Sequence, residues 1–306
     1  MARYFSPSII LLLLTGIVSL LSLFPFPGLL LMLVGGPWWP IITVNVGFLL
    51  LTREALSGRV PRFLIALPVM WFGGYAIAYL GSQIEFRNLG ARIGVDNARQ
   101  NFAFSSAVND IAIDDENNWE LSGLAGEIVS SYNIPVVFQR NSHLKTATHY
   151  AYRLGSSSLC MKLLYDKKFR ETGGVRSLQK NYKFDAEPCI YYTEENPLKP
   201  SIVITSIRSD SGYVLLSSTL NEIRIQGPGN KLLSIKSGYG KTLKWWPSLA
   251  IGGFINSGAQ KWDYFAGFER SKSNVLRGKD GGELSSSSVV AKALGFSPYM
   301  QKKPTI

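Results

Sequence analysis

Long apolar stretches dominate the first part of the chain. Residues 4–52 contain no Asp, Glu, Lys or Arg, and another apolar stretch follows a short basic loop. The hydrocarbon core of a bilayer is about 30 Å thick and is crossed by about 20 apolar helical residues. An uncharged run of 49 residues therefore has room for two passes. The pattern predicts a membrane domain at residues 1–82, with three transmembrane helices at about residues 8–24, 29–52 and 63–81.

Proline and glycine set the expected breaks between these helices. Pro-Phe-Pro-Gly at residues 25–28 predicts a turn, because proline ends a helix and glycine permits the turn. Gly-Gly-Pro-Trp-Trp-Pro at residues 35–40 predicts a kink or a locally unwound stretch inside the second segment. A re-entrant dip is the alternative for that segment, and it would leave two full passes. No small-residue cleavage site follows the first segment, so we expect an uncleaved anchor.

The rest of the chain is typical of a folded domain with mixed helices and strands. Residues 83–104 are polar and irregular, which predicts a juxtamembrane connector that is partly helical at most. Residues 105–296 predict a mixed α+β extracytoplasmic domain that is rich in strands in its C-terminal half. Residues 297–306 predict a loose tail.

Strand–helix–strand order opens this domain. A strand at residues 103–113, a helix from Asn118 to about residue 132 and a strand at residues 134–138 suggest one parallel crossover. A last helix at residues 287–294 should end at Gly295, a residue that favours the C-cap. Between these elements we expect short strands at residues 201–207, 213–217, 220–225, 232–235, 243–246 and 262–268, with turns at residues 209–212, 227–230 and 237–240.

Charge predicts the orientation of the membrane domain. Arg3 precedes the first segment, and the loop after the second carries Arg53, Arg59 and Arg62 against Glu54. Positively charged loops stay in the cytoplasm, so three passes place the large domain outside. In a bacterium, this is a multi-pass inner-membrane protein with a cytoplasmic N-terminus and a periplasmic C-terminal domain. A re-entrant second segment would instead move that domain inside, against the rule.

The two cysteines agree with an oxidising compartment. Cys160 and Cys189 are the only cysteines, and both lie in the large domain. An even count without a leftover thiol suits a disulfide, so we expect a possible bond between them. Two unrelated buried thiols are the alternative.

Motifs for catalysis and metal binding fail in this sequence. The run at residues 237–242 ends like a phosphate-binding loop, but the pattern needs glycine where Ile235 stands, so we read it as a hairpin turn. His143 and His149 lack the spacing of metal ligands, and the serine run at residues 156–158 is loop-like. We therefore expect no catalytic residues, no metal and no cofactor.

Carboxylates crowd the start of the large domain without forming a calcium loop. Their spacing is wrong for such a loop, and its glycine is missing. Acidic side chains in the first turn of a helix complement its positive end, and that is our interpretation here. The four residues are Asp110, Asp114, Asp115 and Glu116.

Two groups of residues are candidate binding surfaces. One is a basic run between the cysteines that contains Lys167, Lys168 and Arg170, interleaved with aromatic residues. The other combines lysine with tryptophan, a pair that often serves interfaces. Burial of these tryptophans in the β core is the alternative, since large aromatic side chains are mostly buried. Its members are Lys244, Trp245, Trp246 and Trp262.

Composition points to function only in outline. The net charge is +11, and a basic domain beside a membrane is attracted to anionic surfaces. We expect a non-enzymatic accessory or assembly subunit of the cell envelope whose partners are membrane lipid and either a protein or an anionic envelope polymer. No nucleic acid is expected. The alternative is an envelope hydrolase or transferase acting on cell-wall or lipid substrates, which would need a pocket with converging titratable groups.

Overall fold

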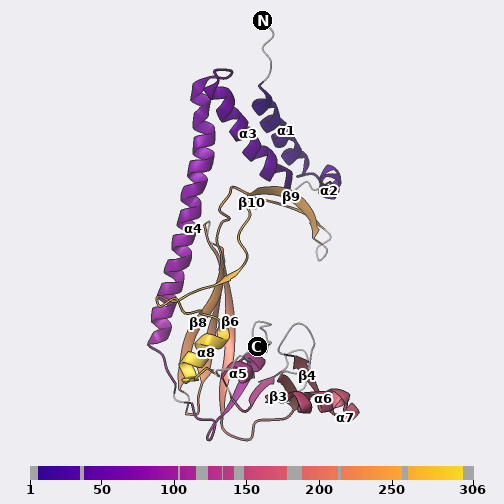
Figure 1. Cartoon of the computed structure of the whole chain (residues 1–306), viewed down its shortest axis with the longest axis vertical. Helices are drawn as coiled ribbons and strands as arrows, with labels where there is room; N and C mark the ends of the chain where they lie inside the picture. The colour runs from indigo at the N-terminus through magenta and orange to yellow at the C-terminus, as the bar shows by residue number, and fades with distance from the viewer. Residues whose placement is uncertain are drawn as a thin grey trace, which may run out of the picture. The chain divides into compact units, whose positions relative to one another are not determined.

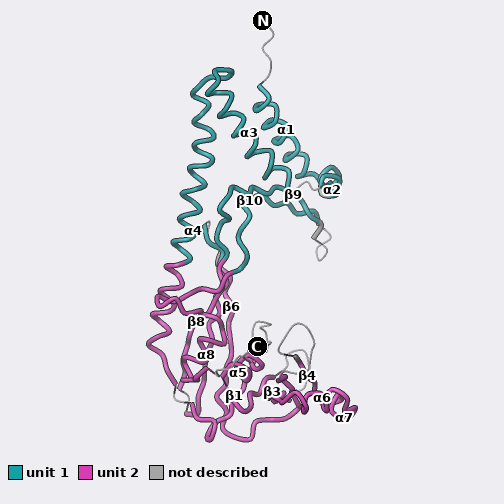
Figure 2. The backbone as a smooth tube through the Cα atoms, viewed as in Figure 1, with its two compact units in different colours: residues 1–86, 213–217, 241–273 teal, residues 87–212, 218–240, 274–306 magenta. Residues whose placement is uncertain are grey.

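In the computed structural model, whose helices and strands are drawn in Figure 1, the chain forms two compact units (Figure 2). Unit 1 comprises residues 1–86, 213–217 and 241–273, and unit 2 comprises residues 87–212, 218–240 and 274–306. A segment from the C-terminal half, residues 241–273, therefore belongs to the same unit as the N-terminal apolar helices. The structure describes residues 6–34, 38–102, 104–114, 123–132, 134–140, 148–177, 188–212, 215–229, 231–256 and 261–298.

Proline lies at the start of the first three helices of unit 1. The predicted break after the first segment is present, but it lies at residues 22–24 instead of residues 25–28. Pro25 opens the next helix, because proline is tolerated in the first turn of a helix, where the backbone N–H groups lack partners. The second apolar segment contains two helices, and residues 35–37 of the expected interruption lie outside the described residues. The helices are α1 (Pro7–Leu21), α2 (Pro25–Leu33) and α3 (Trp39–Leu56), followed by the 3₁₀ turn η2 (Arg62–Ile65) and α4 (Ala66–Ala98).

One described helix is long and apolar enough to cross a membrane. It is the continuous helical stretch Arg62–Ala98, formed by η2 and α4. With 15 and 18 residues, α1 and α3 are about 22 and 27 Å long, which is less than the hydrocarbon thickness of about 30 Å. The structure therefore supports one spanning helix, and the three-pass arrangement stays a prediction.

Helix α1 packs antiparallel along α3. Ser8 at the start of α1 donates its hydroxyl to the Glu54 carboxylate in the last turn of α3, at 2.6 Å, and Ser6 donates to the same oxygen. A carboxylate at a helix N-terminus also complements the positive end of the helix dipole. Further along, Leu12 packs so closely over Gly47 that a Cβ there would lie 2.7 Å from the leucine side chain.

Helix α4 continues through the segment that was expected to be an irregular connector, so that prediction was wrong. Asn97 holds its end in unit 2, because its side chain accepts from the Lys236 backbone N–H at 2.9 Å and donates to the Lys236 carbonyl at 2.6 Å. Two glycines on α4 allow the backbone of residues 277–278 to approach the helix closely. A Cβ on Gly90 would overlap the carbonyl oxygen of Arg277, and one on Gly94 would lie 2.7 Å from the Cα of Gly278.

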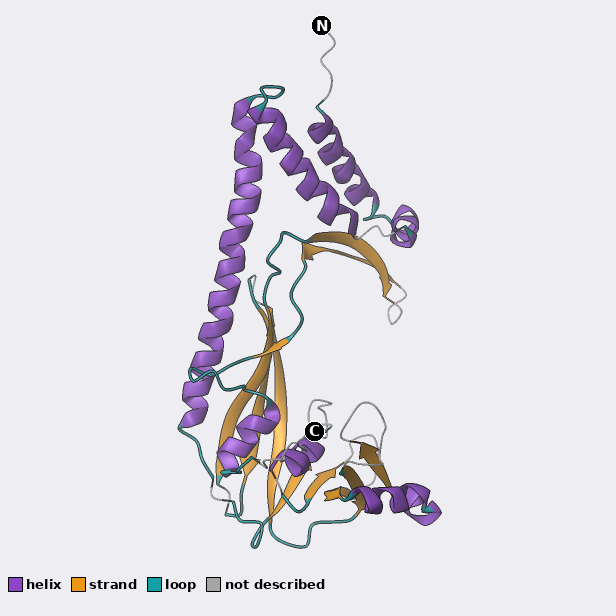
Figure 3. Cartoon of the chain, viewed as in Figure 1, coloured by secondary structure: helices purple, strands orange, loops and turns teal. Residues whose placement is uncertain are grey.

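Unit 2 is built on a nine-stranded sheet in the order β11-β8-β7-β6-β1-β2-β3-β5-β4, so the domain is mixed α+β with a large sheet (Figure 3). Strand β1 pairs in parallel with β2 and β6, and α5 (Leu124–Tyr132) connects β1 to β2, which confirms the predicted crossover. The strands are β1 (Asp110–Asp114), β2 (Val137–Arg140), β3 (His149–Gly155), β4 (Gly173–Ser177), β5 (Cys189–Glu194), β6 (Ser201–Gly212), β7 (Ser217–Gln226), β8 (Leu232–Lys241) and β11 (Asn274–Val275).

The core of unit 2 follows from strand alternation and one amphipathic helix. Ile202 and Ile204 of β6 are fully buried on one face, whereas β1, which pairs in parallel on both sides, is buried on both faces at Ile111, Ala112 and Ile113. The last helix, α8 (Ser286–Leu294), ends at Gly295 in the left-handed conformation at φ 71°, as predicted.

Two predicted turns are continuous strand. Asp210 lies within β6, where its carboxylate accepts from the Thr219 hydroxyl at 2.7 Å and from Arg208 Nε at 3.1 Å; these bonds lower the pKa of Asp210. Gly238 lies within β8, where a Cβ would sit 2.7 Å from the Thr219 carbonyl oxygen. In these two stretches, Asp210 therefore forms a side-chain hydrogen bond to the neighbouring strand, and Gly238 allows close packing against it. The predicted break at residues 227–230 is confirmed, since the Gly227 N–H donates to the Lys231 carbonyl at 2.9 Å.

The close approach at Gly90 gives a test of the α4 packing in unit 2. Gly90→Ala should lower the free energy of unfolding by about 1–3 kcal/mol, because the backbone at Arg277 would have to move away from the new methyl group. Gly73→Ala in the same helix is the control, since nothing lies within 4 Å of its Cβ position. Denaturant unfolding in detergent measures both, and equal effects at the two sites would contradict the packing.

Candidate functional site

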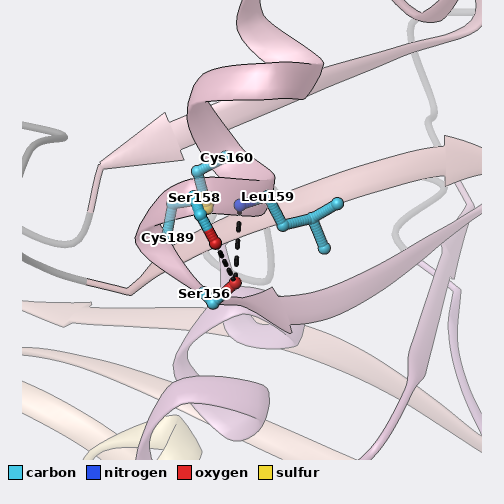
Figure 4. The surroundings of a disulfide bond; sticks show 5 residues. All are labelled: Ser156, Ser158, Leu159, Cys160 and Cys189. Carbon is cyan, nitrogen blue, oxygen red and sulfur yellow. Dashed lines mark hydrogen bonds between the residues drawn. A yellow bond between two sulfur atoms is a disulfide. The ribbon is translucent and has the colours of Figure 1, made fainter.

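A disulfide ties two short helices to the sheet of unit 2. Cys160 in α6 (Ser157–Tyr165) is bonded to Cys189 in β5, with a Cα–Cα distance of 6.1 Å, and both residues are buried (Figure 4). The expected bond is therefore present. Ser156 caps α6 by accepting from the Leu159 N–H at 3.4 Å, so the serine run at residues 156–158 starts a helix and is not a loop.

Exposed cations gather on this disulfide-tied module, which we define as residues 157–177. The short helix α7 (Lys167–Thr172) carries Lys167, Lys168 and Arg170, all exposed. Asp166 accepts from the Lys168 N–H at 2.9 Å and thus caps this helix. None of the three cations forms an ion pair with a residue that the structure describes. Lys162 and Arg176 are also exposed, whereas Lys180 and Lys183 of the same basic run lie outside the described residues.

The second candidate group lies in unit 1, where a non-strand segment after β8 contacts α4. Leu243–Trp246 is not the strand that was predicted, because its backbone bonds to helix side chains instead of a full ladder. The Tyr75 hydroxyl donates to the Lys244 carbonyl at 2.9 Å, and the Leu243 N–H donates to Ser82 Oγ at 3.3 Å. The Lys244 ammonium pairs with the Glu269 carboxylate. Trp246 is thereby placed against Phe72 of α4, and Trp245 lies beside Trp246.

Asn45 joins three parts of unit 1. Its buried side chain donates to the Ile41 carbonyl of its own helix at 2.6 Å and to the Pro247 carbonyl at 2.7 Å. Its Oδ1 accepts from Trp71 Nε1 of α4 at 3.0 Å. Burying an amide in apolar surroundings costs little free energy only when the amide is hydrogen-bonded. Both polar atoms of the Asn45 side chain have such partners.

The tryptophans differ in burial, and none packs in the large β core. Trp245 is 77 % exposed, and Trp246 is half-buried with its ring 5.5 Å from that of Phe72. Trp262 is half-buried in the hairpin of β9 (Leu249–Asn256) and β10 (Lys261–Phe268), where its ring occupies the Cβ positions of Gly28 and Gly253. The predicted strand at residues 262–268 is thus confirmed, and the pairing strand β9 was missed.

A hollow of about 240 Å³ in unit 2 was not predicted from the sequence. Its lining brings together Asp280, Glu283, Ser288 and Lys292, but no histidine or cysteine among the described residues. Glu283 also lies 3.6 Å from Arg277. Within the described residues, no group of three His, Cys, Asp or Glu side chains could hold a metal ion.

The remaining candidates have structural partners. Asp110 accepts from the backbone N–H groups of Leu198 and Lys199, at 3.0 and 2.9 Å, and Asp114 lies 3.7 Å from Arg140. Both belong to β1, so the interpretation as the first turn of a helix is wrong for these two residues. Asp115, Glu116 and His143 lie outside the described residues. His149 Nδ1 lies 3.3 Å from the side-chain oxygen of Asn196.

Similarity to other proteins adds nothing to this picture. No protein-family model matches the chain, and no curated protein or solved structure is similar to it. The two candidate groups also belong to different units of the fold. The basic α6–α7 module is therefore a candidate surface of unit 2, and the aromatic segment after Thr242 is a candidate surface of unit 1.

Asn45 offers the sharpest test of unit 1. Asn45→Leu should lower the free energy of unfolding by about 1–3 kcal/mol, because the Pro247 carbonyl and Trp71 Nε1 would lose their partner. Thr43→Val is the matched control, since its hydroxyl returns to the Trp39 carbonyl of the same helix at 2.8 Å. Unfolding in mixed detergent micelles measures both variants. A loss at Asn45 no larger than that of the control would contradict the role of this residue.

Proposed function

We propose that this chain is a non-enzymatic inner-membrane protein that holds unit 2 outside the cytoplasm, where its basic module binds an anionic partner of the cell envelope. In this proposal the apolar helices of unit 1 are the anchor. The disulfide-tied α6–α7 module is the binding surface, and the partner is an envelope polymer or an acidic protein.

The observation that carries the membrane assignment is the exposed apolar surface of the unit 1 helices. A helix that is apolar around its circumference needs either a protein core or lipid. Contiguous exposed apolar surface of this kind would cause aggregation in water. On α1 the exposed large side chains are Ile10, Leu13, Leu14, Ile17, Leu20 and Leu21, and on α4 they are Leu67, Val69, Met70, Ile77, Leu80 and Ile84.

The packing of α1 against α3 supports three passes in the predicted orientation. The Ser8–Glu54 bond places the start of α1 beside the end of α3, and the loop that follows carries Arg59 and Arg62. These arginines would lie on the cytoplasmic side, where positive loops are retained. Short helices such as α1 and α3 are accommodated when the bilayer thins locally.

The module itself supports binding of an anion-rich partner. Its 21 residues carry five basic side chains, and of the two acidic ones, Asp166 is engaged in capping α7. The disulfide holds α6 on the sheet, so the cations are presented on a fixed support. Structural disulfides are rare in the reducing cytosol, so the bond agrees with an extracytoplasmic location.

Binding by the module is tested by neutralising its cations in the full chain. Lys167→Gln, Lys168→Gln and Arg170→Gln together should weaken binding to isolated cell-wall sacculi about tenfold at low salt, if each exposed cation contributes about 0.5 kcal/mol. The matched control neutralises three other exposed lysines of unit 2, Lys231, Lys236 and Lys279. Co-sedimentation measures both.

Equal losses of binding in the two triple variants would show that only the net charge of unit 2 matters. That result would overturn the module as a binding site. A loss confined to the module variant supports it. Affinity purification from detergent, followed by mass spectrometry, then separates an acidic protein from a polymer, because only a protein partner is recovered with the wild type and lost with the module variant.

A further inference from the structure

The β9–β10 hairpin forms a separate two-stranded sheet inside unit 1. All eight residues of β9 pair with β10, from Leu249 opposite Phe268 to Asn256 opposite Lys261, and no other described strand joins them. A two-stranded hairpin is at best marginally stable in water. It therefore depends on what packs against it.

Helices of unit 1 cover part of this hairpin. The Trp262 ring fills the space above Gly28 of α2. At the other end of β10, the Phe268 ring lies 5.6 Å from that of Trp71 and 4.9 Å from that of Tyr75, both on α4. The hairpin is thus attached to the same helices that expose the apolar surface described above.

Aromatic rings remain exposed on both faces of the hairpin. Tyr264 is 69 % exposed and lies on the face that carries Trp262 and Phe268, because side chains alternate along a strand. Phe254 and Phe265 are exposed on the opposite face, with ring centroids 6.3 Å apart. A protein partner docking on one face would leave the other face bare, whereas lipid can surround both.

Charge and backbone pairing limit the depth at which the hairpin can lie. Lys261 and Asp263 are the only charged residues of the two strands. Each strand also leaves one edge without a partner among the described strands, and unpaired backbone is not tolerated in hydrocarbon. Aromatic residues favour the headgroup layer, where the rings contact the apolar part of the lipid and backbone polar groups form hydrogen bonds to headgroups and water.

We propose that the β9–β10 hairpin and the adjoining Trp245 lie in the headgroup layer of the membrane and bind lipid on both faces. The inference rests on the proposed membrane location of unit 1 and extends it to a segment that lies about 200 residues further along the chain. The occupant is lipid because the hairpin packs on α2 and α4, helices that themselves expose large apolar side chains. In this arrangement the hairpin acts as a second attachment to the membrane, apart from the helices.

Spin labelling of the full chain in liposomes of defined phospholipid tests this proposal. Tyr264→Cys accepts a nitroxide label selectively, because both native cysteines are in the disulfide. Accessibility to oxygen and to a water-soluble nickel complex then reports depth. Leu13→Cys on α1, 59 % exposed, is the lipid reference, and Leu198→Cys, 91 % exposed in unit 2, is the water reference.

The label at residue 264 should show an oxygen-to-nickel accessibility ratio several-fold above that at residue 198 and no higher than that at residue 13. Trp245→Cys provides a second site if the first variant fails to fold. A ratio equal to that at residue 198, with residue 13 in lipid, overturns the inference and leaves the anchor intact. Water access at residue 13 as well would overturn the proposed function itself.

A second copy of the chain is the remaining occupant that this experiment can detect. Line broadening at residue 264 that disappears on dilution with unlabelled protein would show a protein contact there and would overturn lipid binding. Unchanged line shapes on dilution, together with the lipid-like ratio, support it.

Discussion

Apolar surroundings accept a polar group readily only when it is hydrogen-bonded, and two buried side chains of unit 1, Asn45 and Glu54, follow this rule, whereas the buried Trp262 Nε1 has no partner among the described residues. Asn45 satisfies it with partners from three places, its own helix, Trp71 of α4 and the backbone of Pro247. Glu54 satisfies it with the hydroxyls at the start of α1. Because one of these partners lies 202 residues away in the sequence, the unit forms only when the segment from the C-terminal half joins the N-terminal helices.

This arrangement changes how the chain is divided. The sequence separates into an apolar part and a polar part, but the fold assigns residues 241–273 to the unit of apolar helices. The boundary between units falls inside α4, which changes near Phe86 from an apolar helix to one that contacts the loop at residues 277–278 and strand β8. Unit 2 then has its own sheet, its own core and the Cys160–Cys189 disulfide.

Local rules predicted the elements whose cause is local. The helix before Gly295, the crossover from β1 to β2 and the Cys160–Cys189 bond follow from capping, periodicity and cysteine count. The sequence could not show why residues 209–212 and 237–240 stay extended, because the Thr219 side chain and carbonyl that decide this belong to another strand. It also could not predict the end of α4, where the Asn97 side chain bonds to the backbone of Lys236, 139 residues further along the chain. Of the candidate site, the sequence identified the cations and tryptophans but not their division between two units.

The central claim is that a membrane separates the loop after α3 from unit 2. Labelling of intact and permeabilised cells with a membrane-impermeant maleimide tests it, using Ser57→Cys in that loop and Leu198→Cys in unit 2 of the full chain. Both positions are exposed, and the native cysteines are bonded to each other. The account predicts labelling of residue 198 in intact cells and of residue 57 only after permeabilisation. Labelling of both residues under the same condition, or in the reverse order, would contradict it.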